Sequence, residues 1–340
     1  METEQNLKAL HAAFLENGID CVQNESLAKH STFCIGGPAS LIAYPNSRRQ
    51  LIRVLDLWRE LGDNCPICVI GSGSGVLFSD HGYHGLVVIT KNANRIAFEE
   101  DEAPDRDEFR REHIYCQVYA ECGASLTELS NACASPDRAL SGLEFAYRIL
   151  GTVGGATVTN AGAYGSDMER VLVGAEHYDL DSGEIVRLTD LEMDLDYRHS
   201  IYQGHPEWIV LSSVVSLSYG DAANICRCME SNTASRIAKQ PIEYPSAGQV
   251  FKRPVDNFAG RMIEIIGLKG HSIGGAQISN KHAGFIVNRG GATAEDVMAL
   301  IRVVQDEVEK KYGYRLESMI RFMTDDSDAC HTPKAEREMT

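Results

Sequence analysis

Positive charge is scarce in this sequence, and no run of basic residues occurs along it. The 340 residues include 32 lysines and arginines against 48 aspartates and glutamates, which gives a formal net charge of −16. Proteins that bind nucleic acids or anionic membranes rely on clustered lysine and arginine. The composition therefore argues against both kinds of partner, although backbone amides can still hold a compact phosphate without a basic surface.

Long hydrophobic runs are also lacking. The longest uncharged stretch, Ile149 to Ser166, is rich in glycine, threonine and asparagine, so it makes a poor membrane helix. The first residues intersperse acids and a lysine with apolar residues, unlike the charged head and apolar core of a secretory signal. We therefore expect a cytoplasmic protein of about two domains, whose ten scattered cysteines are reduced thiols.

No cysteine pattern meets the requirements of a metal or redox site. Cys65 and Cys68 have C-x-x-C spacing, but they lead into a strand and a glycine loop rather than opening a helix that would lower a thiol pKa. A zinc site needs two more ligands at matched spacing, and Cys226 and Cys228 are separated by a single residue. We expect buried or surface thiols and no bound metal.

Hydrophobic periodicity predicts alternating helices and strands near the N-terminus. The expected elements are a helix that ends at Gly18, a helix from Ser47 to Gly62, and strands at 67–70 and 85–89. This alternation indicates the opening of a unit that mixes helices and strands.

The remaining elements are expected to follow a charged excursion. Residues 99–113 are almost wholly charged and lie between two strand-like segments, which favours a solvated excursion from a hairpin over a docking surface. Ser125 begins a capping box for a helix, and Thr293 begins a long helix that ends at Gly313. The polar segment 221–235 is the expected main domain boundary.

A first glycine loop follows the strand at 67–70 directly. Its alternating glycines let the backbone adopt positive φ and bring amide groups close to a ligand, which suits a diphosphate. The loop lacks the Lys-Ser/Thr of a P-loop, and Val76 stands where a dinucleotide fingerprint has glycine or alanine. The candidate cofactor residues of this loop are Gly71, Ser72, Gly73, Ser74 and Gly75.

A second glycine-rich region occupies residues 151–165. Such small-residue patches are poor material for helices or strands, so either tight backbone packing or a cofactor lying across the glycines must explain them. We favour the cofactor, because a phosphate-type loop is already present. The candidate residues are Thr152, Val153, Gly154, Gly155, Ala156, Asn160, Ala161, Gly162, Ala163 and Gly165.

Taken in order, these motifs resemble the UDP-N-acetylenolpyruvoylglucosamine reductase (MurB) family, flavoenzymes of peptidoglycan precursor synthesis. The resemblance covers nearly all of the chain, and the short stretch between Tyr197 and Gln240 is similar to the branch without an extra substrate-covering loop. The matching segments are 31–39, 71–75, 79–82, 140–146, 151–156, 160–165, 197–200, 240–241, 245–248, 251–254, 259–260, 267–270, 281–283 and 285–288.

The resemblance implies an α+β fold with FAD as cofactor and NADPH as electron donor. It implies a PCMH-type FAD-binding domain at 24–220, with lobes at 24–90 and 91–220, and a smaller C-terminal α/β substrate domain at 221–325. An N-terminal helix at 1–23 and a flexible tail at 326–340 complete the expected chain. The partner is expected to be a nucleotide- or sugar-linked small molecule, and the protein a monomer or weak homo-oligomer.

Departures from the family pattern fall on the residues that the resemblance implies to be catalytic. The family places an arginine and a glutamate around the substrate carboxylate and uses a serine as proton donor. Arg198 matches the arginine, but Gln249 stands for the serine and Met319 for the glutamate. Neither replacement can donate a proton or carry charge in those roles, although Ser246, Glu317 or water could take over. The implied substrate contacts are Tyr197, Lys239, Lys252 and His282.

Three functions follow as hypotheses. The first is an FAD-dependent oxidoreductase that has diverged from enolpyruvate reduction, with Arg198 anchoring an anionic group. The second is the ordinary NADPH-dependent reductase of the family. The third is a flavin- or UDP-sugar-binding protein without turnover.

Overall fold

A four-stranded sheet near the N-terminus carries the first glycine loop in the computed structural model, which describes residues 2–325. The sheet order is β1-β2-β5-β3; β1 and β2 are antiparallel, whereas β2, β5 and β3 are parallel. Its bounds are Asp20–Ser26 (β1), Pro38–Tyr44 (β2), Ile67–Ile70 (β3) and Tyr83–Ile89 (β5).

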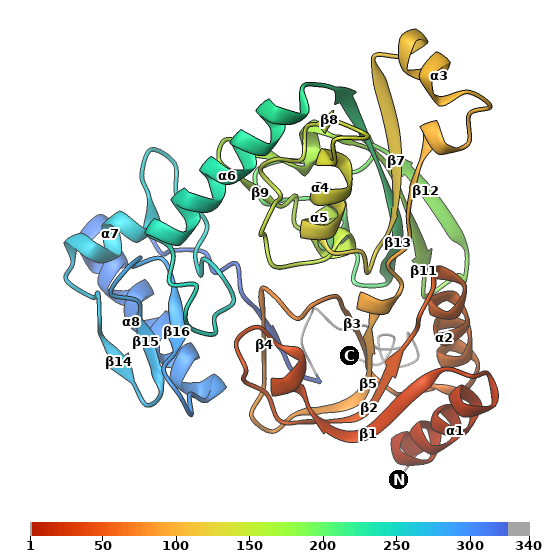
Figure 1. Cartoon of the computed structure of the whole chain (residues 1–340). Coiled ribbons are helices and arrows are strands. Elements are labelled where there is room, and N and C mark those ends of the chain that lie inside the picture. Colours follow the sequence, from red (N-terminus) through yellow and green to blue (C-terminus); the bar gives the residue numbers. More distant parts are fainter. Residues whose placement is uncertain (1, 326–340) are drawn as a thin grey trace.

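Helices α1 (Glu2–Glu16) and α2 (Arg48–Leu61) pack against each other beside this sheet (Figure 1). The local signals that predicted these helices are confirmed: Gly18 has φ of +64°, and the Ser47 hydroxyl accepts a hydrogen bond from the Gln50 amide. The expected strands at 67–70 and 85–89 are present as β3 and as part of β5.

A second, antiparallel sheet forms the other lobe. Its order is β12-β11-β13-β7-β6, and β8 (Leu140–Ser141) pairs with the end of β13. Helices α4 (Leu126–Ala134) and α5 (Val153–Val158) belong to this lobe, and α5 packs on β13. The strand bounds are Ile96–Phe98 (β6), Tyr115–Glu121 (β7), Leu172–Asp179 (β11), Ile185–Thr189 (β12) and Trp208–Tyr219 (β13). Hydrophobic side chains from both lobes join in one core.

The charged excursion at 99–113 is not solvated along its whole length, because its base is anchored to the protein. Strands β6 and β7 form the expected antiparallel hairpin, with α3 (Arg106–Glu112) between them. Glu100, however, is fully buried, and its carboxylate accepts hydrogen bonds from Arg106, Arg110 and Arg138. The prediction of a plain solvated loop is therefore wrong at its base, because two arginines of the excursion and the more distant Arg138 compensate the buried charge.

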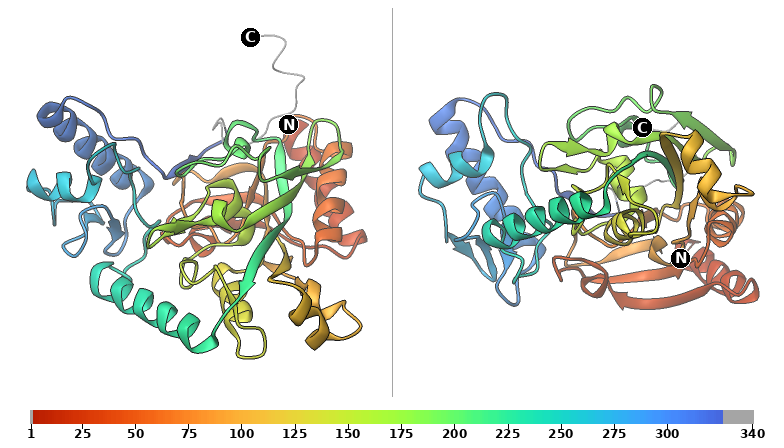
Figure 2. Two further views of the ribbon diagram at one scale, coloured as in Figure 1. Left: turned by 90° about the horizontal axis from the view of Figure 1, so that it is seen from above. Right: turned by 45° about the horizontal axis from the view of Figure 1, so that its top comes forward.

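Helix α6 (Ala222–Lys239) leads from the second lobe to the C-terminal part (Figures 1 and 2). The expected boundary segment 221–235 lies in this one continuous helix and its N-cap residue Asp221, so the division into domains there stays a prediction. In the C-terminal part, α8 (Ala294–Tyr312) lies against the sheet β14-β15-β16. The remaining bounds are Ala259–Ile265 (α7), Ser272–Ile273 (β14), Ala276–Ile278 (β15) and Ile286–Asn288 (β16).

The end of the described chain returns to the first lobe. Strand β17 (Arg321–Met323) pairs in parallel with β4 (Val76–Phe78), directly after the first glycine loop. The carboxylate of Asp80 also accepts hydrogen bonds of 2.9 and 3.2 Å from the amides of Ala294 and Glu295, at the start of α8. These contacts fix the C-terminal part against the first lobe.

Within residues 2–325, no helix is long and apolar enough to cross a membrane. Cys65 and Cys68 are buried, and burial raises the pKa of the Cys65 thiol to about 12. The same residues contain no group of three or more histidine, cysteine, aspartate or glutamate side chains placed to hold a metal ion. The tail expected at 326–340 lies outside the described residues.

Candidate active site

One large cleft lies between the two lobes and the C-terminal part. Its volume is about 1610 Å³, above the roughly 300–1,000 Å³ of ordinary small-molecule sites. Most of its lining residues fall within 67–76 of the first lobe, 148–167 and 197–210 of the second lobe, the end of α6, and the C-terminal part. The cleft therefore has room for an extended cofactor and a second ligand.

All five residues of the first glycine loop line this cleft. Gly73 and Gly75 have φ values of +66° and +72°, which L side chains rarely adopt. A Cβ on Gly73 would overlap the carbonyl oxygen of His30, whereas a Cβ on Gly75 would meet nothing within 4 Å. In the described part of the chain, the amides of Ser72, Ser74 and Gly75 donate no hydrogen bond. They are thus available to a ligand phosphate.

The second glycine segment forms the start of α5, where Thr152 is the N-cap residue. A Cβ on Gly154 would come within 2.8 Å of the Cβ of Cys122, so this glycine allows close packing. A Cβ on Gly155 would meet only the Thr152 hydroxyl, at 3.7 Å, so this glycine presents open backbone to the cleft. Thr152, Gly154, Gly155 and Ala156 line the cleft, whereas Val153 lies in the core.

Asn160 holds the turn that follows α5. It is buried with φ of +40°, and its amide group donates to the Asp196 carbonyl and accepts from the Glu169 amide. The turn continues through the short hairpin β9–β10 (Gly162–Ala163 and Ser166–Asp167). Residues 160–163 and 165 all line the cleft, as expected of cofactor contacts.

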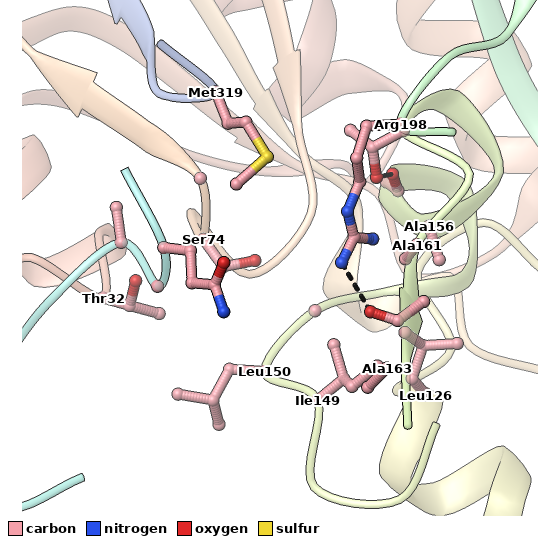
Figure 3. A pocket seen from close by; sticks show the side chains of 18 of the residues that line it. Thr32, Ser74, Leu126, Ile149, Leu150, Ala156, Ala161, Ala163, Arg198 and Met319 are labelled. Carbon is pink, nitrogen blue, oxygen red and sulfur yellow. Dashed lines mark hydrogen bonds between the residues drawn. The ribbon is translucent and has the colours of Figure 1, made fainter. Parts of the chain in front are cut away.

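Arg198 extends from an adjacent loop into the same space. Its backbone has φ of +55°, and its guanidinium donates to the carbonyl oxygens of Asn160, at 3.4 Å, and Gly162. Figure 3 shows Arg198 and Met319 projecting toward the same part of the cleft from opposite sides. A positively charged group therefore lines the same cleft as the position where the family has a glutamate.

Gln249 and Met319 are placed by short backbone pairings in the C-terminal part. Gln249 bridges to Phe285, and the Met319 amide donates a 2.7 Å hydrogen bond to the Val250 carbonyl. Both residues line the cleft. The two departures from the family pattern therefore alter one wall of one site.

The four predicted substrate residues separate into two groups. Tyr197 and His282 line the cleft; the Tyr197 hydroxyl accepts a hydrogen bond from the Arg253 amide, and burial lowers the pKa of His282. Lys239 is exposed at the end of α6, and Lys252 forms an ion pair with Glu317. Neither lysine lines the cleft, so a direct substrate contact by either stays a prediction.

The cleft is lined by more basic than acidic residues, unlike the acidic chain as a whole. Seven Arg and Lys residues line it against three acidic residues, and within residues 2–325 only the lysine is ion-paired. The cations are Arg148, Arg198, Arg236, Arg253, Arg261, Lys281 and Arg321; the acids are Asp167, Glu243 and Glu264. Unpaired arginines in a concave site raise the local concentration of anionic ligands.

Sequence reasoning missed Arg236. It lies on α6, where its Nε and Nη2 atoms are buried without a hydrogen-bond partner in the described chain. Its guanidinium stands 5.5 Å from the ring of Tyr164, and burial lowers its pKa. A lone arginine in a polar helix carries no motif, so only the packing of α6 against the cleft identifies it.

The structure pairs Ser246, named above as a possible substitute proton donor, with Thr32 of the first lobe. The Thr32 hydroxyl donates to the Ser246 carbonyl at 2.8 Å, and the Ser246 amide donates to the Thr32 carbonyl at 3.0 Å. Both residues line the cleft, and in the described chain the Ser246 hydroxyl has no hydrogen-bond partner. Ser246 is therefore a free proton-carrying group beside Gln249.

The cleft fits the flavin dinucleotide that the sequence motifs imply. Open backbone at Gly75 and Gly155, together with the unpaired amides at 72–75, provides a surface that a diphosphate can approach without a side chain in the way. Neighbouring unpaired arginines offset its negative charge. These residues would hold the cofactor across the space between the lobes.

Comparisons with known proteins agree with this geometry. Residues 39–189 match the family model of an FAD binding domain, and residues 240–323 match that of the C-terminal domain of UDP-N-acetylenolpyruvoylglucosamine reductase.

Several curated proteins and one solved structure are similar over most of the chain. The UDP-N-acetylenolpyruvoylglucosamine reductase of Caldanaerobacter subterraneus subsp. tengcongensis is 41% identical over 300 residues, which cover 88% of this chain and 92% of the relative. The reductase of Latilactobacillus sakei subsp. sakei is 42% identical over 313 residues, which cover 92% of this chain and 96% of the relative. The crystal structure of the reductase from Thermus caldophilus has a TM-score of 0.68 and 30% identity, over 89% of this chain and 98% of that one.

Proposed function

Because the chain belongs to the UDP-N-acetylenolpyruvoylglucosamine reductase family, as an FAD-dependent oxidoreductase, we propose that it reduces an enolpyruvyl ether carried on a UDP-sugar, with NADPH as electron donor. The observation that carries the proposal is the convergence of both glycine segments, Arg198 and the unpaired arginines on one cleft. A cytoplasmic location and a role in peptidoglycan precursor synthesis belong to the same proposal.

The charge of the cleft supports a nucleotide-linked substrate. FAD, NADPH and a UDP-sugar each carry a diphosphate, and seven lining cations against three acids suit such ligands in a chain of net charge −16. Bound FAD supplies hydride transfer to the substrate. The residues of the chain have to bind the substrate anion, stabilise the charge that develops on it, and deliver a proton.

Arg198 is suited to the first two of these tasks. Its guanidinium is held by two backbone carbonyls and has no carboxylate partner in the described chain, so it can pair with a substrate carboxylate. The proton has to come from elsewhere, because the amide of Gln249 is no practical acid. Ser246 lines the cleft with a free hydroxyl, whereas Glu317 is paired with Lys252 outside the cleft. We therefore assign the proton transfer to Ser246 or to water that it binds.

We propose a flavin-dependent reaction other than enolpyruvate reduction as a second candidate function. The observation that favours it is that Gln249 and Met319 lie on the same wall, where two polar catalytic groups are replaced together. Met319 makes that wall less polar and removes a carboxylate from the region that Arg198 faces (Figure 3).

An anaerobic half-reaction distinguishes the two. The bound flavin is reduced with NADPH, UDP-N-acetylglucosamine enolpyruvate is added, and the oxidised flavin absorbance is followed. Recovery of the absorbance with formation of UDP-N-acetylmuramate supports the reductase. A flavin that is reduced but stays reduced favours the second function, and a flavin that NADPH cannot reduce favours the binding protein without turnover.

A further inference from the structure

A short strap from the first lobe packs into the C-terminal part. It consists of residues 31–35, which lie between the short helix η1 (Leu27–His30) and β2. The side chains of Phe33 and Ile35 are buried in the hydrophobic core that includes α7 and α8. The side-chain amide of Asn288, on β16, donates a 3.1 Å hydrogen bond to the Phe33 carbonyl. These contacts fix the strap to the C-terminal part, although in sequence it belongs to the first lobe.

Thr32, in this strap, is bonded both to the first glycine loop and to the segment that carries Ser246. Its amide donates a 3.0 Å hydrogen bond to the carbonyl of Gly73. Its hydroxyl donates to the Ser246 carbonyl at 2.8 Å, and its carbonyl accepts a 3.0 Å hydrogen bond from the Ser246 amide. Thr32, Gly73 and Ser246 all line the cleft. One residue therefore links the loop that would hold the cofactor diphosphate to the candidate proton donor.

The segment around Ser246 depends on such contacts for its position. Residues 245–248 belong to no helix or strand. The Asn288 amide donates a 2.9 Å hydrogen bond to the Pro245 carbonyl, and Thr32 bonds both backbone groups of Ser246. The hydroxyl of Ser246, in contrast, has no hydrogen-bond partner among the described residues and lines the cleft. The backbone of Ser246 is thus fixed, while its hydroxyl is left for a ligand.

We propose that Thr32 is a positioning residue for proton transfer, because its hydroxyl sets the place of the Ser246 hydroxyl relative to the cofactor. The inference rests on the proposed reduction of an enolpyruvyl ether, in which Ser246 supplies the proton. Reduction of the carbon–carbon double bond adds a hydride to one carbon, with reduced FAD as its source, and a proton to the other. Ser246 passes its hydroxyl proton to the second carbon and recovers a proton from water, so its own charge is unchanged after turnover.

Distance explains why this one hydroxyl matters. A proton donor must come within about 2.6–3.2 Å of the atom that it protonates, or act through one water. A displacement of about 1 Å can cost roughly a hundredfold in rate. The family places its donor at the position of Gln249, whereas Ser246 lies earlier in the same segment and bonds directly to the strap. In this chain the strap therefore controls the distance from the donor to the substrate.

The first test measures the two flavin half-reactions of the holoenzyme. Thr32→Val removes the hydroxyl and keeps the size of the side chain. We expect flavin reoxidation by UDP-N-acetylglucosamine enolpyruvate to slow about 10- to 100-fold. The solvent deuterium isotope effect on this step should rise about twofold, because proton transfer then limits the rate. Flavin reduction by NADPH should not change, and Thr32→Ser, which keeps the hydroxyl, should reoxidise at nearly the unmodified rate.

Ser130→Ala is the matched control. The Ser130 hydroxyl also donates a 2.8 Å hydrogen bond to a backbone carbonyl, that of Leu143, but it is buried in α4 and does not line the cleft. This variant should lose stability to a similar extent as Thr32→Val, with both half-reactions and the isotope effect unchanged. A purely structural role of Thr32 would make the two variants behave alike. Where Thr32→Val does not fold, Thr32→Ala takes its place.

A double-mutant cycle decides whether Thr32 acts through Ser246. Ser246→Ala removes the proposed donor but keeps the carbonyl that Thr32 bonds. In this background Thr32→Val should change the reoxidation rate by no more than about twofold, because the group that it positions is already absent.

Three outcomes would overturn the inference while the proposed function stands. Thr32→Val could reoxidise its flavin with the enolpyruvate as fast as the unmodified protein, or its loss of rate could be the same with and without the Ser246 hydroxyl. Loss of bound FAD in both Thr32→Val and Thr32→Ala would instead assign Thr32 to cofactor binding. If the enolpyruvate cannot reoxidise the flavin of the unmodified protein, the proposed function fails and the inference fails with it, so the unmodified protein distinguishes the two failures.

Discussion

The Met319 amide donates a 2.7 Å hydrogen bond to the carbonyl of Val250, and this contact sets Met319 next to the segment that carries Gln249. Both residues line the cleft that Arg198 also lines. The two replacements therefore act on one reacting centre. Their effects should be coupled, because residues that share a site seldom contribute independently.

Restoring both polar groups should strengthen enolpyruvate reduction. We expect the double variant Gln249→Ser, Met319→Glu to reoxidise the reduced flavin with UDP-N-acetylglucosamine enolpyruvate about 10²–10⁴ times faster than the unmodified protein, the range that one placed acid provides. Stopped-flow absorbance measures this step. Each single variant should raise the logarithm of this reoxidation rate by less than half of the increase that the double variant gives.

The control for this pair is the reduction of flavin by NADPH. That rate should change less than threefold, since neither replacement touches the glycine segments. If the unmodified protein already reoxidises at the rate of the double variant, Ser246 or water is a sufficient proton donor, and Ser246→Ala should then slow the step.

Removing the positive charge of Arg198 should slow the reaction with substrate and should not weaken FAD binding. In Arg198→Met, the hydrocarbon part of the side chain is kept while the charge facing the cleft is lost. We expect flavin reoxidation by substrate to fall about 100-fold or more, with FAD retention intact because Arg198 bonds Asn160 and Gly162 and not the amides at 72–75. Arg198→Lys keeps the charge but not the two-carbonyl geometry and should give an intermediate rate. Equal losses of FAD and of activity would contradict the assignment and indicate that Arg198 only supports the turn at Asn160.

Local signals in the sequence were sufficient for the helix ends and for the cofactor loops. Ser47 and Thr293 cap their helices as their sequence neighbours indicate, and Gly313 ends α8 with φ of +79°. Such caps depend on residues three or four positions apart, so a local reading finds them. The glycine segments were found for the same reason, and both line the cleft.

Long-range contacts could not be predicted in this way. Asp80 is a capping residue for α8, more than 200 positions away, and nothing near Asp80 in the sequence indicates it. Arg236 becomes a cleft residue only because α6 passes the second lobe, and Glu100 is compensated in part by Arg138 and Tyr219, which are distant in the sequence. Each of these depends on tertiary packing, which local patterning does not encode.

Substitutions at the neighbouring glycines Gly154 and Gly155 of α5 should affect different properties: stability at Gly154 and FAD binding at Gly155. Gly155→Glu should abolish FAD retention, since the side chain would extend into open cleft, while the melting temperature of the apoprotein should fall by no more than a few degrees. Gly154→Ala should instead lower the melting temperature of the apoprotein by several degrees, because its Cβ would stand 2.8 Å from the Cβ of Cys122. A purified Gly155→Glu protein that is still yellow would refute the cofactor position.

The buried carboxylate of Glu100 should make stability depend on pH. Burial alone would raise its pKa, but hydrogen bonds from Arg110, Arg106 and Tyr219 outweigh burial and lower the pKa to about 2 from an ordinary value of 4.5. A group whose pKa is depressed in the folded state stabilises that state above its unfolded pKa and loses this contribution as the pH falls toward the folded value. The window therefore lies between about pH 4.5 and pH 2.

Glu100→Gln should accordingly lower the free energy of unfolding by about 3 kcal/mol at pH 7, since it leaves three arginines facing a neutral amide. Urea titrations at pH 7, 5, 4 and 3 measure this. The difference between variant and unmodified protein should be constant from pH 7 to 5 and shrink below pH 4.5. Glu102→Gln, an exposed change in the same excursion, is the matched control and should stay within about 0.5 kcal/mol at every pH. A difference that persists undiminished at pH 3 would mean that packing of the side chain, rather than its charge, anchors the excursion.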